Sequence, residues 1–66
     1  MKIRYMEWLL NKELFTAEGQ QTVPRVGEFI AHNNRYYKVV LVTHNYSKDL
    51  HYSATVELEP FVKRDL

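Results

Sequence analysis

The chain has 66 residues, which is room for a single domain over residues 1–66, and a domain of this size hides only about 60% of its unfolded surface. Nine Lys and Arg residues against eight Asp and Glu residues give a net charge of +1, which excludes a strong overall attraction to nucleic acid. The absence of cysteine excludes a disulfide framework and thiolate metal sites. Because the sequence has no bilayer-length apolar run and no signal-peptide pattern, we predict a cytoplasmic protein without membrane contact.

The first third of the chain predicts two strands, over residues 2–10 and 13–21, which form a hairpin that turns at Asn11 and Lys12. Large apolar residues on both sides of this turn suit the hairpin. Good helix formers between Met6 and Leu14 leave a short N-terminal helix as the alternative.

A strand over residues 26–31 follows, entered through Pro24 and Gly27, which favour a sharp turn. The next turn is predicted at residues 32–34, because its two asparagines tolerate positive φ. It leads into a further strand over residues 35–44, so that the two strands form an antiparallel hairpin.

The strand over residues 35–44 is apolar in both of its alternating sets. One set contains Tyr37, Val39 and Leu41, and the other is also partly apolar, so the strand is covered on both faces or lies in a sharply bent sheet. A polar connection over residues 45–50 then joins it to the last strand.

The clearest strand spans residues 51–59, where apolar residues occupy every second position from Tyr52 to Leu58. One face of this strand is therefore buried and the other is wet. Pro60 removes a backbone donor and is expected to close or kink the strand.

Five short antiparallel strands predict an all-β fold, a small five-stranded antiparallel barrel that hides most of its strand edges. Three stretches resemble small proteins of phages and mobile elements that adopt Src-homology-3-like β-barrels: residues 23–28 (Val-Pro-Arg-Val-Gly-Glu), 37–40 (Tyr-Lys-Val-Val) and 56–60 (Val-Glu-Leu-Glu-Pro). The resemblance implies the barrel fold and a phage origin, and it assigns no catalytic residue.

The groups able to carry chemistry form no recognisable catalytic pattern. His44 and His51 face each other if the second hairpin is in register, which suits one metal ion or phosphate, but no third ligand has the spacing of a zinc site. Glu57 and Glu59 share a solvent face and are expected to keep it soluble. With two glycines in the chain, no phosphate-cradling loop is present. We predict no catalysis, no cofactor and no bound metal.

Two groups of residues are the best candidates for contact with a partner. Guanidinium and ammonium groups bind phosphates or carboxylates, and tyrosine rings present rigid contact area to a base or a protein. The candidates of this kind are Arg25, Arg35, Tyr36, Lys38 and Tyr46. Trp8, with its apolar neighbours Met6, Leu9 and Leu10, marks a homodimer or host-protein interface if it is exposed, and a core anchor if it is buried.

The favoured interpretation is a non-enzymatic binding protein encoded by a phage. It occupies a site on a host protein in fixed stoichiometry, as an inhibitor of the anti-defence type. In one version of this hypothesis the protein forms a homo-oligomer. Two alternatives stay open. One is a small nucleic-acid-binding barrel, which uses the basic residues and the tyrosines. The other is an oligomeric sponge that encloses a nucleotide-like signal molecule between its subunits.

Overall fold

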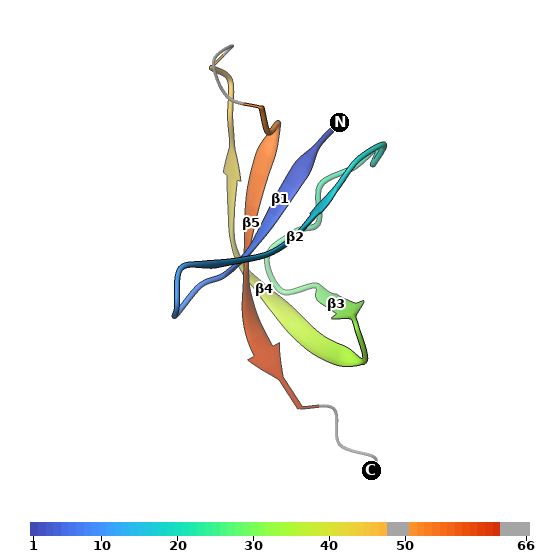
Figure 1. The fold of residues 1–66 in the computed structure, drawn as a ribbon, viewed down its shortest axis with the longest axis vertical. Helices are drawn as coiled ribbons and strands as arrows, with labels where there is room; N and C mark the ends of the chain where they lie inside the picture. The colour runs from blue at the N-terminus through green and yellow to red at the C-terminus, as the bar shows by residue number, and fades with distance from the viewer. Residues whose placement is uncertain (48–50, 63–66) are drawn as a thin grey trace.

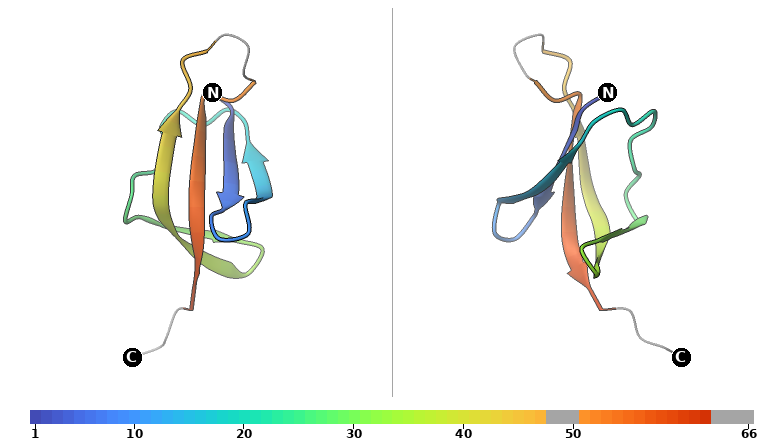
Figure 2. Two further views of the ribbon diagram at one scale, coloured as in Figure 1. Left: turned by 90° about the vertical axis from the view of Figure 1, so that its left-hand side faces the viewer. Right: turned by 45° about the vertical axis from the view of Figure 1, so that its right-hand side comes forward.

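A computed structural model describes residues 1–47 and 51–62 of the chain, and over these ranges the fold is all-β. One curled sheet forms a half-barrel, seen from three sides in Figures 1 and 2. Its strands are β1 (Ile3–Glu7), β2 (Lys12–Ala17), β3 (Phe29–His32), β4 (Arg35–His44) and β5 (Ala54–Phe61). Among the described residues there is no helix long and apolar enough to cross a membrane.

The strands lie in the order β2-β1-β5-β4-β3, and the sheet is mixed. All neighbours are antiparallel except β1 and β5, which run parallel from Ile3 opposite Ala54 to Glu7 opposite Leu58. The prediction of an entirely antiparallel sheet is therefore wrong for this pair. Since β1 and β5 come from opposite ends of the chain, no tight turn joins them, and a long connection permits the parallel direction.

The N-terminal segment is a hairpin, so that prediction is confirmed and the helical alternative is wrong. β1 ends earlier than expected because residues 8–11 form the connection, with Asn11 at a φ of 50°. Asparagine is one of the few residues that adopt this left-handed conformation at low cost. β2 begins at Lys12, which was expected in the turn, and ends at Ala17, before the predicted end at residue 21.

The segment from Pro24 to Glu28 turns sharply before β3 begins. The Glu28 amide donates a hydrogen bond to the Arg25 carbonyl (3.0 Å), and Gly27 has a φ of 95°, which is the geometry of a type II turn. Gly27 and Glu28 together oppose Val39: the Gly27 amide donates to the Val39 carbonyl, and the Val39 amide donates to the Glu28 carbonyl (both 2.9 Å). This is a glycine bulge, which delays the start of β3 to Phe29.

The predicted β3–β4 hairpin is confirmed. Asn33 and Asn34 form its two-residue loop with φ values of 50° and 63°. Positive φ at both positions defines a type I′ turn, whose twist matches that of the flanking strands.

A second bulge divides β4. The register against β5 shifts between Val39 and Leu41, so the alternation is interrupted there. Val39 is buried, whereas Leu41 is exposed and Val42 packs on the core in its place. The prediction that Leu41 shares a side with Val39 is wrong for this reason.

β5 begins later and ends later than predicted, and it runs through Pro60, which stands opposite Tyr37. The Trp8 amide donates to the Leu58 carbonyl (3.0 Å), so the backbone groups of Leu58 face β1. Pro60 lies two residues farther and faces the same side, beyond the point where β1 ends. Because none of the described strands pairs with β5 on that side beyond β1, the missing N–H of proline breaks no ladder bond and the strand continues.

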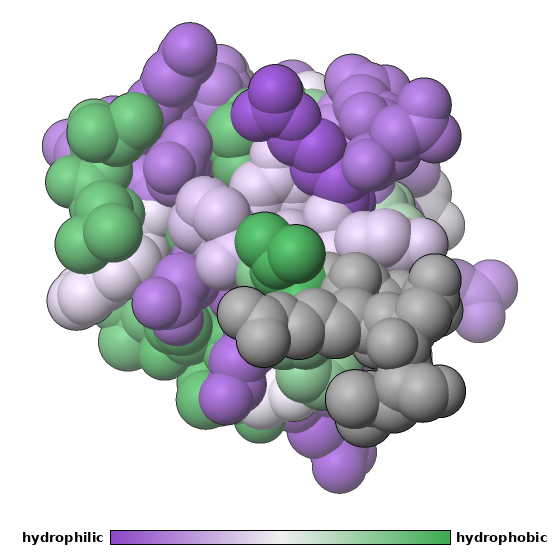
Figure 3. Space-filling model, turned by 90° about the horizontal axis from the view of Figure 1, so that it is seen from below, coloured by the Kyte–Doolittle hydropathy of each residue, from purple (hydrophilic) through white to green (hydrophobic). Residues whose placement is uncertain are grey.

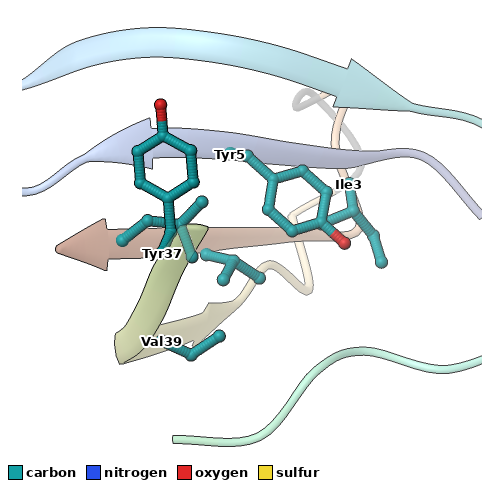
Figure 4. Packing of buried hydrophobic residues seen from close by; sticks show 6 residues of the cluster. Ile3, Tyr5, Tyr37 and Val39 are labelled. Carbon is teal, nitrogen blue, oxygen red and sulfur yellow. The ribbon is translucent and has the colours of Figure 1, made fainter. Parts of the chain in front are cut away.

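The concave side of the half-barrel holds the core, shown in Figure 4. Its buried members are Ile3, Tyr5, Tyr37, Val39, Val56 and Leu58. Strands β2 and β3 are the two sheet edges, and their side chains meet across the opening. The Phe15 ring stacks on Tyr5 (centroids 4.4 Å apart) and on His32 (3.9 Å), so a stack of three rings links β1, β2 and β3.

Replacement of Gly27 by alanine tests the type II turn. We expect Gly27→Ala to lower the free energy of unfolding by about 1 kcal/mol, because a Cβ is strained at this φ while the surrounding space is open. Gly27→Asn is the control, since asparagine tolerates positive φ, and its loss is expected to be smaller. Urea unfolding measures both, and equal losses would contradict this account of the turn.

The ring stack predicts an energetic coupling between the two sheet edges. In a double-mutant cycle of Phe15→Leu and His32→Leu, we expect a coupling energy of about 0.5–1.5 kcal/mol. The same cycle with Phe15→Leu and Phe29→Leu is the control, because Phe29 is not part of the stack, and these two changes should be additive. A coupling of zero in the first cycle would show that the stack does not hold the edges together.

Tyr5 predicts a loss of stability in alkali. Burial raises the pKa of the Tyr5 hydroxyl above its ordinary value of 10.0, and this hydroxyl donates a hydrogen bond to Gln20 Oε1 (2.7 Å). Above about pH 10 the unfolded chain loses this proton while the folded protein keeps it, so the free energy of unfolding falls as the pH rises. Tyr5→Phe should flatten this fall, and Tyr46→Phe, at an exposed tyrosine, should leave it unchanged.

Candidate functional site

The convex side of the sheet carries an exposed aromatic group across three strands. Tyr36 stands opposite Phe61, and Phe29 stands opposite Lys38, one row farther along. The rings of Phe29 and Phe61 lie 4.8 Å apart at 50° to each other. All three aromatic residues are exposed, although aromatic side chains usually gain most of their stabilisation by burial.

The apolar character of the convex side continues toward β1. Leu41 on β4, Glu57 on β5 and Met6 on β1 stand in one row of the sheet. Met6 is only 6% exposed, yet it does not belong to the core cluster, and strand alternation places it on the face opposite to Tyr5. We call the exposed residues Phe29, Tyr36, Leu41 and Phe61 the outer apolar face.

The connection between β1 and β2 projects from the sheet (Figure 1) and presents three consecutive large apolar residues. Trp8, Leu9 and Leu10 are 47%, 70% and 68% exposed. In Figure 3 hydrophobic residues (green) gather along the left side of the molecule. The same connection lies on the left in Figure 1. We call residues 8–10 the apolar turn.

The six residues that the sequence proposes for partner contact do not form one cluster. Arg35, Tyr36 and Lys38 lie together at the start of β4, and Tyr36 belongs to the outer apolar face. The other three are spread over different connections: Trp8 in the apolar turn, Arg25 in the turn before β3, and Tyr46, which is 93% exposed, after the end of β4.

The two histidines considered for a metal or phosphate are not opposite each other in the ladder. His44 pairs with Ala54 rather than with His51, because the connection after β4 extends to Ser53. The Ser53 amide donates a hydrogen bond to the Lys2 carbonyl. Residues 48–50 of this connection lie outside the described residues. Within the described ranges, no group of three His, Cys, Asp or Glu residues is placed to hold a metal ion.

The sequence alone did not indicate a basic and aromatic cluster at the start of β1. The ammonium of Lys2 lies 5.2 Å from the ring centroid of Tyr52, and the guanidinium of Arg4 lies 5.5 Å from it. Carboxylates pair with both cations: Lys2 Nζ is 3.7 Å from Glu18, and Arg4 Nε is 3.5 Å from Glu13. The pairing of β1 with β5 creates this cluster, and no local sequence pattern indicates it.

The exposed pair Phe29 and Phe61 also escaped the sequence analysis. Phe29 reads as an ordinary strand residue, and Phe61 follows Pro60, at which the strand was expected to end. Only the continuation of β5 to Phe61 brings the two rings together.

No protein-family model, curated protein or solved structure matches this chain. The resemblance to Src-homology-3-like proteins of phages and mobile elements therefore stays a prediction, and function is argued from the geometry of the apolar turn and the outer apolar face.

Proposed function

We propose that this protein is a non-enzymatic protein-binding module that inserts its apolar turn into an apolar groove of a partner protein. The observation that carries the proposal is the exposure of Trp8, Leu9 and Leu10 at the tip of a projecting connection. Polar residues and glycine dominate tight connections, so three large apolar residues at such a tip are costly unless another molecule covers them.

The apolar turn is held in position without a partner. Glu7 and Lys12 pair at its base, and the Trp8 amide bonds the Leu58 carbonyl of β5. A connection fixed on both sides loses little conformational freedom on binding, which favours affinity. Trp8 is also the residue type most enriched among the side chains that dominate interface energies.

The size of the surface agrees with one interface of ordinary area. A stable complex buries about 800 Å² on each partner. That is roughly 15% of the 5312 Å² surface of this protein. The apolar turn alone is too small, so the proposed interface extends over β5 onto Leu41 and Phe61 of the outer apolar face.

The distribution of charge favours a protein over a nucleic acid as the partner. Lys2 and Arg4 are paired with glutamates, and Lys38 stands opposite Glu59 in the ladder. A surface that binds nucleic acid through released counterions needs several cations free of such neighbours.

The resemblance to small phage and mobile-element barrels supports a relationship to Src-homology-3-like folds and a phage origin. The further parts of the proposal are a host protein as the partner and inhibition by occupation of its surface, and they are supported by the absence of a recognisable catalytic pattern in the sequence. Occupation in fixed stoichiometry requires a rigid patch and no catalytic group. The well-packed half-barrel supplies such a patch.

The apolar turn is tested by photo-crosslinking from position 10 in cells that produce the protein, followed by calorimetric titration of the captured partner. We expect one-to-one binding that Trp8→Ala weakens by roughly 30-fold, as for a tryptophan that contributes about 2 kcal/mol at an interface. Tyr46→Ser is the matched control, because it removes another exposed aromatic residue and should leave the affinity unchanged.

Circular dichroism melting of each variant separates lost binding from lost folding. If Trp8→Ala retains full affinity while Tyr46→Ser loses it, the proposed surface is wrong. If sedimentation shows a wild-type dimer that the double substitution Leu9→Ser and Leu10→Ser dissociates, the occupant is a second copy and the proposal of a different partner protein fails.

A further inference from the structure

An open groove lies at the end of β1 opposite to the apolar turn. The chain before β1, the connection between β2 and β3, and the end of β4 form its walls, and it has a volume of about 510 Å³. This lies within the usual range of pockets for small molecules, about 300–1,000 Å³. The lining residues are Met1, Gln21, Thr22, Val23, Pro24, Arg25, Val26, Val42 and His44.

The chemistry of the groove is apolar with a cationic side. Val23, Val26 and Val42 supply branched aliphatic walls, and Arg25 supplies a guanidinium. Among the described residues no carboxylate lines the groove. His44 adds an imidazole that can hydrogen-bond to an anionic oxygen.

The local fold keeps Arg25 available to a ligand. Its backbone is fixed, because Arg25 follows Pro24 and is the first residue of the type II turn. The Glu28 amide closes this turn by donating a hydrogen bond to the Arg25 carbonyl. The carboxylate of Glu28 accepts a hydrogen bond from the backbone amide of Arg25 rather than from its guanidinium. The ion pairs found among the described residues involve Lys2 and Arg4 and leave Arg25 out.

We propose that this groove binds a small organic anion, in which a phosphate or carboxylate group contacts Arg25 and an apolar body rests on the valine walls. Arginine binds either group through two parallel hydrogen bonds, so both sources of the anion share one recognition chemistry. Among the described residues no carboxylate lines the groove, and the carboxylate of Glu28, which is near Arg25, accepts a hydrogen bond from the Arg25 backbone amide. The site lies within one protomer and is independent of the apolar turn.

The experiment is a titration of the isotope-labelled protein with phenyl phosphate and with N-acetyl-phenylalanine, followed by amide chemical shifts. We expect shift changes concentrated at residues 21–23, 25, 26, 42 and 44 with at least one of the two anions, and the preferred anion identifies the acidic group. Arg25→Gln should weaken binding roughly tenfold, as for the loss of a charge-assisted hydrogen bond. Arg35→Gln, at an exposed arginine outside the groove, is the matched control and should leave the affinity unchanged.

Two further probes test the two halves of the proposed ligand. Inorganic phosphate lacks the apolar body and benzyl alcohol lacks the charge, so each should bind much more weakly than phenyl phosphate. The proposal is overturned if inorganic phosphate binds as tightly as phenyl phosphate, if Arg25→Gln and Arg35→Gln have equal effects, or if neither anion shifts the groove residues at millimolar concentration. Because Arg25 lies away from the apolar turn, failure here leaves the protein-binding proposal intact.

Discussion

The parallel pairing of β1 with β5 is the contact on which the rest of the structure depends. Among the strands that the structure describes, β5 is the one that the hairpin of β1 and β2 joins, and an isolated two-stranded hairpin is at best marginally stable in water. Pairing with β5 inserts this hairpin beside the β3–β4–β5 meander and brings Ile3 and Tyr5 over Val56 and Leu58. The core, the ring stack and the position of the apolar turn all follow from this one junction.

The small size of the chain explains why the two sides of the sheet differ. Curling of five strands in a chain of 66 residues leaves one concave side, which the core residues and their half-buried neighbours fill. The chain has no helix or second sheet, within its described residues, to cover the convex side, so Phe29, Tyr36 and Phe61 stay exposed there. A small domain exposes a large share of its apolar surface for this geometric reason, and the proposed interface makes use of it.

Local signals in the sequence predict most of the fold. Alternation identifies β5, the paired asparagines identify the β3–β4 turn, and the positions of Pro24 and Gly27 identify the sharp turn before β3. Three features were beyond the reach of such signals. The parallel neighbour of β5 is a long-range contact, the bulge that exposes Leu41 depends on tertiary register, and Pro60 is tolerated only because β1 ends before it.

For the candidate sites too, the sequence indicates individual residues but not how residues from distant segments group together. Residue type pointed to Trp8 and Arg25, since tryptophan and arginine are enriched among the side chains that dominate interface energies. The grouping of side chains from distant segments, as in the groove that joins Arg25 to His44 or the contact of Phe29 with Phe61, depends on how the strands pair. Periodicity describes which side of a strand a residue occupies, and it carries no information about the neighbour across the sheet.

The central position of β5 also bears on the order in which parts of the sheet can form during synthesis. β5 lies between β1 and β4, yet it is the last of the five strands to leave the ribosome. Until it emerges, the N-terminal hairpin has no sheet to join, and the apolar faces of both halves remain open to solvent or to chaperones. We therefore expect the complete sheet to form only after β5 has emerged, through contacts between residues more than 45 positions apart, such as Tyr5 and Val56.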